Sequence, residues 1–462
     1  MNTLNAINEK IGHYRWRICA LVFFATTINY LDRNVLGLLK MTLTEELQWT
    51  ETDFAHIVMV FQLAYAVGLL GIGGVIDKIG TKAGYAASLL GWSFAAMGHA
   101  LARTTFGFGV ARAALGVTEA GNFPAANKAV AEWFPKKERA LATGIYNSGC
   151  NIGAIVAPLT VPFIAEQWGW QWAFILTGAI GLIWIVFWYT SYSSPEKKLE
   201  KGSLSKAEYD YIHSDKDEAY EDAPQTEKEH VSWFKLFKYR QTWSFFFGKF
   251  LTDPIWWFFI FWLPAFLDGE NARKLEAFEA LYPNGAPEGI EPGVISWPLA
   301  VAVVYTVSTI GSIFGGWLPE HFINRGMNAN KARKLSMFIY ALLPITVLFA
   351  QTLGQIHTWY AVAVISIGCA AHQAWSANIY TTVSDMFPKK AVASVSGIGG
   401  MAGAVGGMLI AWGTGILLDH FKALGEIETG YGIIFVVCAL AYIVAWCLMH
   451  LLVPRFKQIT DL

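Results

Sequence analysis

Phe134-Pro135-Lys136-Lys137, followed by Gly144, recurs later in the chain as Phe387-Pro388-Lys389-Lys390, followed by Gly397. The spacing from the phenylalanine to the glycine is the same in both copies, and each copy has an acidic residue two positions before the phenylalanine. Each copy also follows the fourth apolar stretch of its half of the chain, which favours an internal duplication over a chance match. Two parallel repeats related by an axis along the membrane normal are typical of transporters.

The composition of the chain indicates a protein that spans a membrane many times. Of its 462 residues, 54% are hydrophobic and only 15% are charged, and the mean hydropathy is +0.38. A soluble protein usually has about a quarter of its residues charged, so much of this surface must face lipid. The net charge is -1, and without a basic block nucleic acid is not expected as a partner. The five cysteines have neither the spacing of a disulfide framework nor the neighbours of a zinc site.

Apolar stretches long enough to cross a bilayer recur along the whole chain. About 20 apolar residues cross a hydrocarbon core about 30 Å thick, and the sequence contains about twelve such stretches. They lie near residues 17–39, 54–76, 83–102, 105–131, 141–165, 170–191, 242–267, 296–323, 334–353, 358–381, 392–418 and 430–453. Lysine and arginine are concentrated before the first span and after even-numbered spans, so we expect both termini in the cytoplasm. The expected fold class is an all-α membrane protein with twelve transmembrane helices in two pseudo-symmetric six-helix halves.

Two hydrophilic segments divide these spans. The polar segment 193–240 parts six spans from six and is predicted to be a cytoplasmic linker with some amphipathic helix. We therefore expect an N-terminal six-helix bundle over residues 1–192 and a C-terminal six-helix bundle over residues 241–462. The segment 268–296, which contains several prolines and glycines, falls between spans 7 and 8 and is expected to form an extracytoplasmic insertion, as a cap or a loop.

Four charged residues lie inside the predicted spans, where an ionised side chain costs at least about 2.5 kcal/mol. Asp32 and Arg33 are in span 1, whereas Arg112 and Glu119 are seven residues apart in span 4 and so lie on nearly the same helix face. Because span 1 runs outward and span 4 inward, Asp32 and Arg112 fall at matching depth. We expect these two to pair or exchange partners while Arg33 faces a cavity; bracing the helices is the alternative role of such charges.

When all four residues are ionised, their charges sum to zero. Protonation of Asp32 or Glu119 leaves one excess positive charge, which favours an anion, and loss of the proton releases it. This is proton–anion coupling in outline, with Asp32, Glu119 and Arg112 as the candidate coupling residues. An arginine suits a carboxylate ligand because its planar fork can bind both oxygens.

Polar and aromatic residues on other spans suggest the rest of a substrate site. They could hydrogen-bond the hydroxyl groups of a ligand or stack on a sugar ring, although bonding between helices is the commoner role for any single one. The candidate substrate-binding residues are Arg33, Tyr30, Tyr65, Asn151, His372, Gln373, Ser376 and Asn378. Lys249 and Asp253 are four residues apart in span 7, so they can pair on one helix face and either act as a gate or merely neutralise each other.

The loop after span 2 reads Gly73-Gly74-Val75-Ile76-Asp77-Lys78-Ile79-Gly80-Thr81-Lys82. It resembles the loop motif of the major facilitator superfamily, a glycine followed by Asp-Arg/Lys-x-Gly-x-Arg/Lys, and it falls in the loop where that motif is expected. The resemblance implies that Asp77 holds a cytoplasmic gate by meeting a helix N-terminus and a nearby arginine such as Arg139. The positive end of a helix dipole favours an anion there.

More narrowly, the chain resembles the anion:cation symporter family and, within it, bacterial hexuronate transporters. The matching segments are Tyr30-Leu31-Asp32-Arg33-Asn34, the run from Arg112 to Ala120, Phe123-Pro124-Ala125, Glu132-Trp133-Phe134-Pro135, Asp253-Pro254, Trp262-Leu263-Pro264 and Ala371-His372-Gln373-Ala374. The resemblance implies import of glucuronate or galacturonate with protons across a bacterial inner membrane. It places Arg33 at the substrate carboxylate and makes Asp32 and Glu119 the protonation sites. The segment 268–296 departs from the family pattern.

Residues and spacing by themselves predict a proton-linked carrier of a small anion in the lipid bilayer, with no cofactor and no bound metal, and the resemblance implies a small organic anion. We expect a monomer. The same fold could carry another anion, such as an aldonate, a dicarboxylate or phosphate, or use sodium in place of protons. A transport-dead nutrient sensor is a further alternative, but such proteins usually have a long soluble output segment. An enzyme is not expected, because no nucleophile elbow, metal-ligand pair or phosphate loop is visible.

Overall fold

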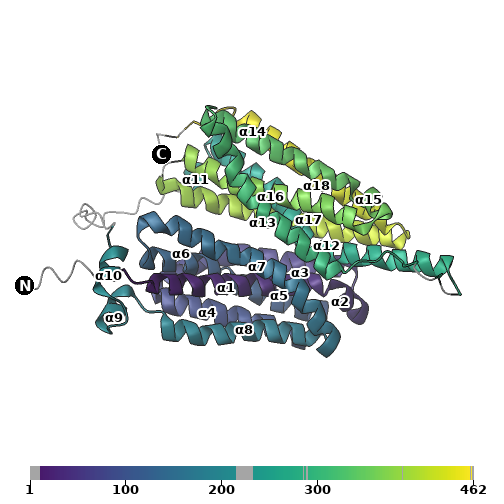
Figure 1. Cartoon of the computed structure of the whole chain (residues 1–462), viewed down its shortest axis with the longest axis horizontal. Helices are drawn as coiled ribbons and strands as arrows, with labels where there is room; N and C mark the ends of the chain where they lie inside the picture. Colours follow the sequence, from purple (N-terminus) through teal and green to yellow (C-terminus); the bar gives the residue numbers. More distant parts are fainter. Residues whose placement is uncertain are drawn as a thin grey trace, which may run out of the picture.

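The computed structural model describes residues 11–214, 233–284, 286–287, 290–387, 389–457 and 459. Throughout these residues the regular structure is helical, and no strand occurs among them. The helices form two groups that lie side by side, with α1 to α10 in the lower part of Figure 1 and α11 to α18 in the upper part.

The first group contains the first six predicted spans. Its long helices are α1 (Tyr14–Leu38), α3 (Glu51–Ile79), α4 (Thr81–Gly98), α7 (Lys136–Trp168) and α8 (Trp170–Ser191), and the fourth span is divided into α5 (Thr105–Glu119) and α6 (Asn122–Trp133). The short elements are α2 (Lys40–Leu47), η2 (His99–Leu101), α9 (Pro195–Glu200) and α10 (Lys206–Ile212). A capping box begins α3: the Thr50 hydroxyl accepts the Asp53 N–H, and the Asp53 carboxylate accepts the Thr50 N–H.

The second group contains the other six spans. Its long helices are α12 (Arg240–Leu281), α13 (Trp297–Asn324), α16 (Thr358–Met386), α17 (Lys389–Ala423) and α18 (Ile427–Leu452). The ninth span consists of α14 (Ala329–Leu342), η4 (Leu343–Phe349) and α15 (Ala350–Ile356), and the short α11 (Trp233–Leu236) precedes α12. Within the described residues, all twelve predicted spans are therefore helical.

Two of these helices differ from the sequence-based expectation. α12 does not end near residue 267 but continues to Leu281 and is 42 residues long, so the first half of the segment 268–296 extends this helix. The extension is rich in alanine, glutamate and leucine, which favour helix, and the first proline of the segment comes only at Pro283. Span 4 is broken after Glu119, where α6 turns close to α4: a Cβ on Gly121 would collide with the hydroxyl of Ser88.

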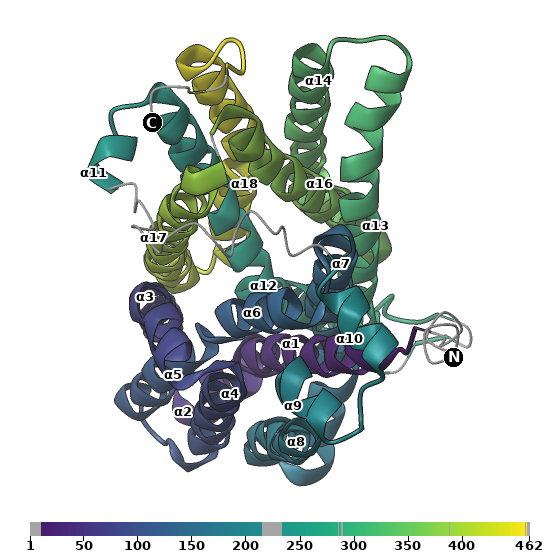
Figure 2. The ribbon, with the colours of Figure 1, turned by 90° about the vertical axis from the view of Figure 1, so that its left-hand side faces the viewer.

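The same helix pairs pack together in both groups. α1 packs against α7, α3 against α5 and α4 against α8; six spans later, α12 packs against α17, α13 against α16 and η4 against α18. This repetition agrees with the duplication predicted from the sequence. Between the groups, α3 packs against α17 and α7 against α13, and Figure 2 shows both pairs from the end of the bundle.

The surface of the bundle is suited to lipid. Eight helical segments of the described chain are long and apolar enough to cross a bilayer by length and composition alone. α1, α4, α5 and α16 belong to the remaining four spans, and α1 and α5 carry buried charges that lower their hydropathy. Large apolar side chains such as Phe24, Leu70, Phe106, Ile183 and Ile313 are exposed on the outside, where water would not favour them.

Candidate functional site

The first group encloses a fully buried ion pair between α1 and α5. Arg33 donates from both Nε and Nη2 to Oε2 of Glu119, over 2.9 and 2.8 Å. The Arg33 side chain is 2% exposed and that of Glu119 is 0% exposed. Buried charges are tolerated when hydrogen bonds replace their hydration, and here both bonds go to one oxygen. The other oxygen of Glu119, Oε1, has no hydrogen-bond partner among the described residues.

Four aromatic rings surround the Arg33 guanidinium, and we call them the aromatic cage. The ring centroids of Tyr30, Phe61, Tyr65 and Trp257 lie 4.9, 5.3, 4.8 and 5.5 Å from its Cζ atom. Contacts of this kind attract a cation that has been removed from water. Three of the rings come from α1 and α3, whereas Trp257 comes from α12 of the second group. The cage therefore holds Arg33 where the two helix groups meet.

Close packing of α7 fixes the position of α1 beside the cage. A Cβ on Gly149 would lie 2.6 Å from the backbone oxygen of Phe23, and one on Gly153 would lie 2.5 Å from that of Thr27. Any larger side chain at these positions would push α1 away and move Arg33 with it. Asn151, a predicted substrate residue, lies between the two glycines and is half-buried.

The expected ion pair between Asp32 and Arg112 is not formed. Asp32 is 2% exposed, and neither of its carboxylate oxygens has a hydrogen-bond partner among the described residues. Arg112 is fully buried and donates from Nη2 to the backbone oxygen of Arg33 over 3.3 Å. Neighbouring residues of a helix point about 100° apart, and α1 is rotated so that Arg33, not Asp32, meets Glu119. We refer to these four residues as the central charges.

The expectation that Arg33 faces an open cavity is also wrong in this conformation, because its guanidinium is paired and buried. The predicted residues Tyr30 and Tyr65 do lie beside it, as rings of the aromatic cage. The structure therefore brings together Arg33, its two tyrosines and Glu119, whereas Asp32 forms no hydrogen bond with this set.

A second ion pair lies on α12, as its four-residue spacing predicts. Lys249 Nζ is 2.7 Å from Asp253 Oδ2. The Lys249 ammonium also lies over the ring of Tyr380 on α16, 4.7 Å from the centroid. The Lys249 side chain is 5% exposed and that of Asp253 is 20% exposed. The carboxylate is thus the accessible member of this pair.

Three of the predicted substrate residues on α16 lie near one another. His372 is buried, with Nδ1 2.7 Å from the hydroxyl of Tyr442 and its ring stacked on Trp256 at a centroid distance of 5.1 Å. Gln373 and Ser376 are half-buried. The histidine is therefore held by packing, whereas the other two retain accessible surface.

Asn378, the fourth predicted substrate residue on α16, has a structural role. Its Nδ2 donates to the backbone oxygen of Gly315 over 2.6 Å and to that of Ala374 over 2.9 Å. Both N–H groups are used in this way, so Asn378 braces α16 against α13 and has no donor left for a ligand in this conformation.

The predicted inner gate lies outside the described side chains. Asp77 falls near the end of α3 and Arg139 in the first turn of α7, and the structure describes only the backbone of these two residues.

At the end of the bundle where α2 lies, opposite α10 in Figure 1, the two groups are joined by charged contacts. Lys40 Nζ lies 2.6 Å from Glu51 Oε2, and the same oxygen accepts the Trp262 Nε1–H over 3.1 Å. The backbone N–H groups of Glu51 and Thr52 donate to the two oxygens of Asp419, each over 2.7 Å. We call Lys40, Glu51, Trp262 and Asp419 the outer interlock, because they lie at one end of the bundle and not at its centre.

The outer interlock is not among the residues that the sequence predicts. Its charged residues lie at the ends of spans, where charged residues are common and do not indicate a site. Trp262 and Asp419 are 211 and 368 residues away from Glu51 along the chain. The one local signal is the capping box at Thr50 and Asp53. It predicts the start of α3, whose free N–H groups attract a carboxylate.

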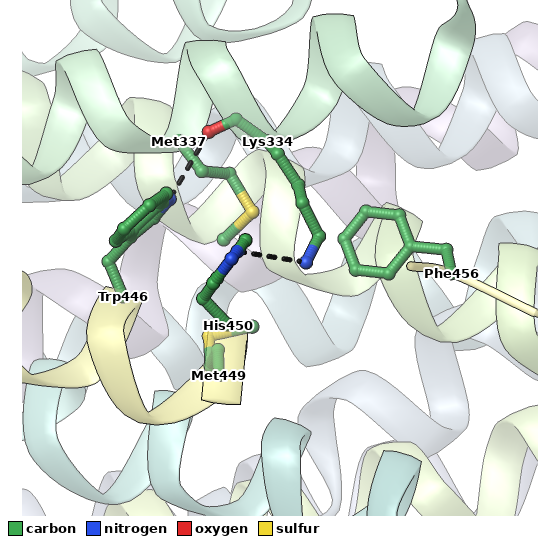
Figure 3. Close-up of a pocket in the computed structure, with 6 residues that line it drawn as sticks. All are labelled: Lys334, Met337, Trp446, Met449, His450 and Phe456. Carbon is green, nitrogen blue, oxygen red and sulfur yellow. Dashed lines mark hydrogen bonds between the residues drawn. The ribbon is translucent and has the colours of Figure 1, made fainter. Parts of the chain in front are cut away.

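The central charges are distinct from the pocket in Figure 3. That pocket is lined by Lys334, Met337, Trp446, Met449, His450 and Phe456, from α14, α18 and the end of the chain. The Trp446 Nε1–H donates to the backbone oxygen of Lys334 over 3.2 Å, which packs α18 on α14. No predicted site residue lines this pocket. Among the described residues, no cluster of three His, Cys, Asp or Glu is placed to hold a metal ion.

Comparisons with known proteins agree with this fold. A family model described as Major Facilitator Superfamily matches residues 22–411. The chain is 33% identical to a hexuronate transporter of Escherichia coli (strain K12) over 417 residues, which are 89% of each chain. It is 32% identical to a galacturonate transporter of Dickeya chrysanthemi over 370 residues, which are 79% of this chain and 97% of that protein.

A solved structure with a similar fold is that of a bacterial homologue of the human lysosomal transporter Spinster, in an inward-facing and unoccupied conformation. The TM-score is 0.72 at 17% sequence identity, and the match covers 97% of this chain and 99% of the other. At this identity the similarity concerns the fold alone. It confirms the predicted all-α membrane fold.

Proposed function

The chain belongs to the Major Facilitator Superfamily, and from this premise we propose that it imports a hexuronate together with protons by alternating access. Its family and relatives are membrane transporters, and the chain is a multi-pass membrane protein. The hexuronate and galacturonate transporters among the relatives support glucuronate or galacturonate as the substrate. In this proposal the membrane is a bacterial inner membrane, and both termini are cytoplasmic.

The observation that carries the proposal is the buried pair of Arg33 and Glu119 within the aromatic cage. A guanidinium that gives two hydrogen bonds to one oxygen can exchange that partner for a substrate carboxylate without losing its bonds. The rings of Tyr30, Tyr65 and Trp257 would then offer flat apolar surfaces to a sugar ring. A uronate supplies both features, one carboxylate and one ring.

Proton coupling follows from what happens to Glu119. When a substrate carboxylate binds Arg33 in place of Glu119, the glutamate loses the cation that paired with it. A buried charge left without its partner costs about 3–5 kcal/mol. A proton on Glu119 removes this cost, so the anion and the proton bind together. One proton and one monovalent anion leave the total of the central charges unchanged.

Asp32 is the second protonation site in this mechanism. It is buried without an ion-pair partner among the described residues, and the charges that act on it are those of Glu119 and Arg112. A proton that moves between the two carboxyl groups would therefore change the charge beside Arg33 without any movement of the helices. Arg112 stays in place and balances whichever carboxylate is ionised.

Alternating access requires that the two helix groups move against each other. We propose that residues 1–192 and 241–462 are the moving halves of a monomer, joined by the linker 193–240. The outer interlock closes the α2 end of the bundle in this conformation, so it must open before a substrate enters from that side. Asp77 and Arg139 would close the opposite end in the other state.

Radiolabelled uptake into proteoliposomes tests the proposal. Uptake of glucuronate, galacturonate, galactonate, glucarate and phosphate is measured with and without an inward proton gradient, and with a sodium gradient as the control. We expect the two uronates to accumulate only when the proton gradient is present, and a proton ionophore to abolish the accumulation. Failure to take up either uronate would refute the substrate, and uptake that ignores the gradient would refute the coupling.

A further inference from the structure

The Lys249–Asp253 pair lies one helical turn from the aromatic cage. Asp253 precedes the cage residue Trp257 by four residues on α12, which corresponds to a rise of about 6 Å along the helix. The face that bears both residues packs against α17. A Cβ on Gly403 would collide with Asp253 Oδ2, and one on Gly407 would lie 2.9 Å from the Trp257 ring. A six-carbon sugar acid held at Arg33 would extend along this turn of α12 toward Asp253.

The pair is neutral overall, but its two charges are not equally available. The Lys249 ammonium is buried between its carboxylate partner and the ring of Tyr380. Asp253 retains a fifth of its side-chain surface. A ligand that reaches this turn of α12 therefore meets a carboxylate. Hydroxyl groups donate hydrogen bonds to a carboxylate, whereas a second carboxylate on the ligand is repelled by it.

We propose that Asp253 determines which sugar acids are accepted, by binding the hydroxyl end of a substrate whose carboxylate is at Arg33. The site then favours acids with one carboxylate over aldarates, which carry a carboxylate at both ends. Lys249 contributes by holding Asp253 in place, and Asp253 in turn masks its charge. This inference rests on the proposed function, because it takes Arg33 as the anchor of the substrate carboxylate. In this proposal the Lys249–Asp253 pair selects the substrate and does not act as a gate.

Asp253→Asn tests the inference, because it leaves Lys249 as an unmasked cation beside the site. Counterflow of glucuronate and of glucarate is measured in proteoliposomes, since counterflow needs no proton gradient. We expect glucarate exchange to rise at least about tenfold relative to glucuronate, the worth of one hydrogen bond to a charged group. The control Lys249→Gln/Asp253→Asn also loses the repulsion but gains no unmasked cation, so we expect a smaller rise there. An unchanged ratio in Asp253→Asn would overturn the inference.

A pair of glycine variants tests it without altering any charge. In Gly403→Ala the new methyl group displaces the Asp253 carboxylate, so we expect the apparent affinity for glucuronate to fall about three- to tenfold. Gly400→Ala is the matched control on the same helix, because nothing lies within 4 Å of a Cβ at that position. Identical affinities in the two variants would contradict the role of Asp253, even if Asp253→Asn failed to fold.

The wild-type protein separates this inference from the proposed function. If it exchanges glucuronate while the variants keep its selectivity and affinity, only the role of Asp253 is refuted. If it exchanges no uronate at all, the proposed function is refuted, and the inference falls with it.

Discussion

Two buried ion pairs of this protein have the same chemistry but different connections. Arg33–Glu119 and Lys40–Glu51 each join a cation to a glutamate, at 2.8 and 2.6 Å, and no side chain among the four is more than 6% exposed. In each pair both residues belong to the first helix group. Burial and distance alone would therefore assign them the same role.

The connections to the second helix group distinguish the two pairs. Arg33 meets that group only through a ring contact with Trp257 among the interactions described above, whereas Glu51 accepts a hydrogen bond from Trp262 and donates one to Asp419. Separation of the groups would break the outer hydrogen bonds and leave the central pair intact. The central pair is thus suited to binding and proton exchange, and the outer pair to control of the conformation.

Replacing the cation of each pair by the other basic residue should give the largest contrast in uptake rate between the two pairs. Arg33→Lys keeps the charge but loses the two-donor fork, so we expect uptake of glucuronate to fall about 100-fold, equivalent to about 3 kcal/mol. Lys40→Arg can still pair with Glu51, and we expect uptake within about threefold of the wild type. Initial rates in proteoliposomes, with gel-filtration profiles as the folding control, measure both. Equal losses would break the comparison.

Replacing Glu119 or Glu51 by glutamine should give a smaller effect on the uptake rate, but only one of the two variants should lose proton-driven accumulation. For one proton per anion, each pH unit of gradient supports about tenfold accumulation. Glu119→Gln cannot exchange the proton, so we expect it to lose this accumulation while it still catalyses counterflow. Glu51→Gln should retain the accumulation. Steady-state glucuronate levels under an imposed pH gradient test this, and gradient-driven accumulation by Glu119→Gln would exclude Glu119 from the proton route.

Asp419→Ala should affect the α2 end of the bundle alone. The carboxylate accepts two N–H groups at the start of α3, and loss of such a cap costs about 1–2 kcal/mol, which lowers amide protection about 5- to 30-fold. Hydrogen exchange at Glu51 and Thr52 is the measurement, and a peptide of α1 that contains Arg33 is the internal control. Faster exchange of the α1 peptide as well would mean that the two regions are not independent.

The smallest effects on glucuronate affinity should come from replacing the aromatic rings that contact Arg33 and Lys40. Phe61→Leu removes a ring 5.3 Å from Arg33, and Phe54→Leu removes one 5.3 Å from Lys40 Nζ. A partly desolvated cation–π contact contributes about 0.5–1 kcal/mol, so we expect Phe61→Leu to weaken glucuronate affinity about two- to fivefold. Phe54→Leu should leave that affinity unchanged. Counterflow titrations compare the two, and the reverse order would contradict the assignment of the central pair to binding.

Most of the fold could be predicted because it depends on local properties of the chain. The second span was expected at 54–76 and is helical over Glu51–Ile79, since the bilayer requires a run of apolar residues whose backbone groups bond within the segment. The pair of Lys249 and Asp253 was predictable for a similar reason. Four residues along a helix place two side chains on one face, whatever the rest of the protein does.

The pairing within the central site could not be predicted. Asp32 and Arg33 are neighbours in sequence, and which of them forms an ion pair with a charged residue of span 4 depends on the rotation of α1 about its own axis. That rotation is set by the contacts of Gly149 and Gly153 with α1, which join residues far apart in the chain. The use of Asn378 Nδ2 to brace α16 has the same origin, because its partner Gly315 lies on another helix.

The sequence by itself determined that this protein crosses a membrane about twelve times in two related halves, with charges buried in spans 1 and 4. These properties follow from hydropathy, helical periodicity and repetition, which are readable one segment at a time. Only the tertiary structure decided that Arg33 binds Glu119, that Asp32 forms no ion pair with Arg112, and that Glu51 bonds to the second helix group. These choices depend on the angles and distances between helices, and the free energy that fixes them comes from packing across the whole bundle.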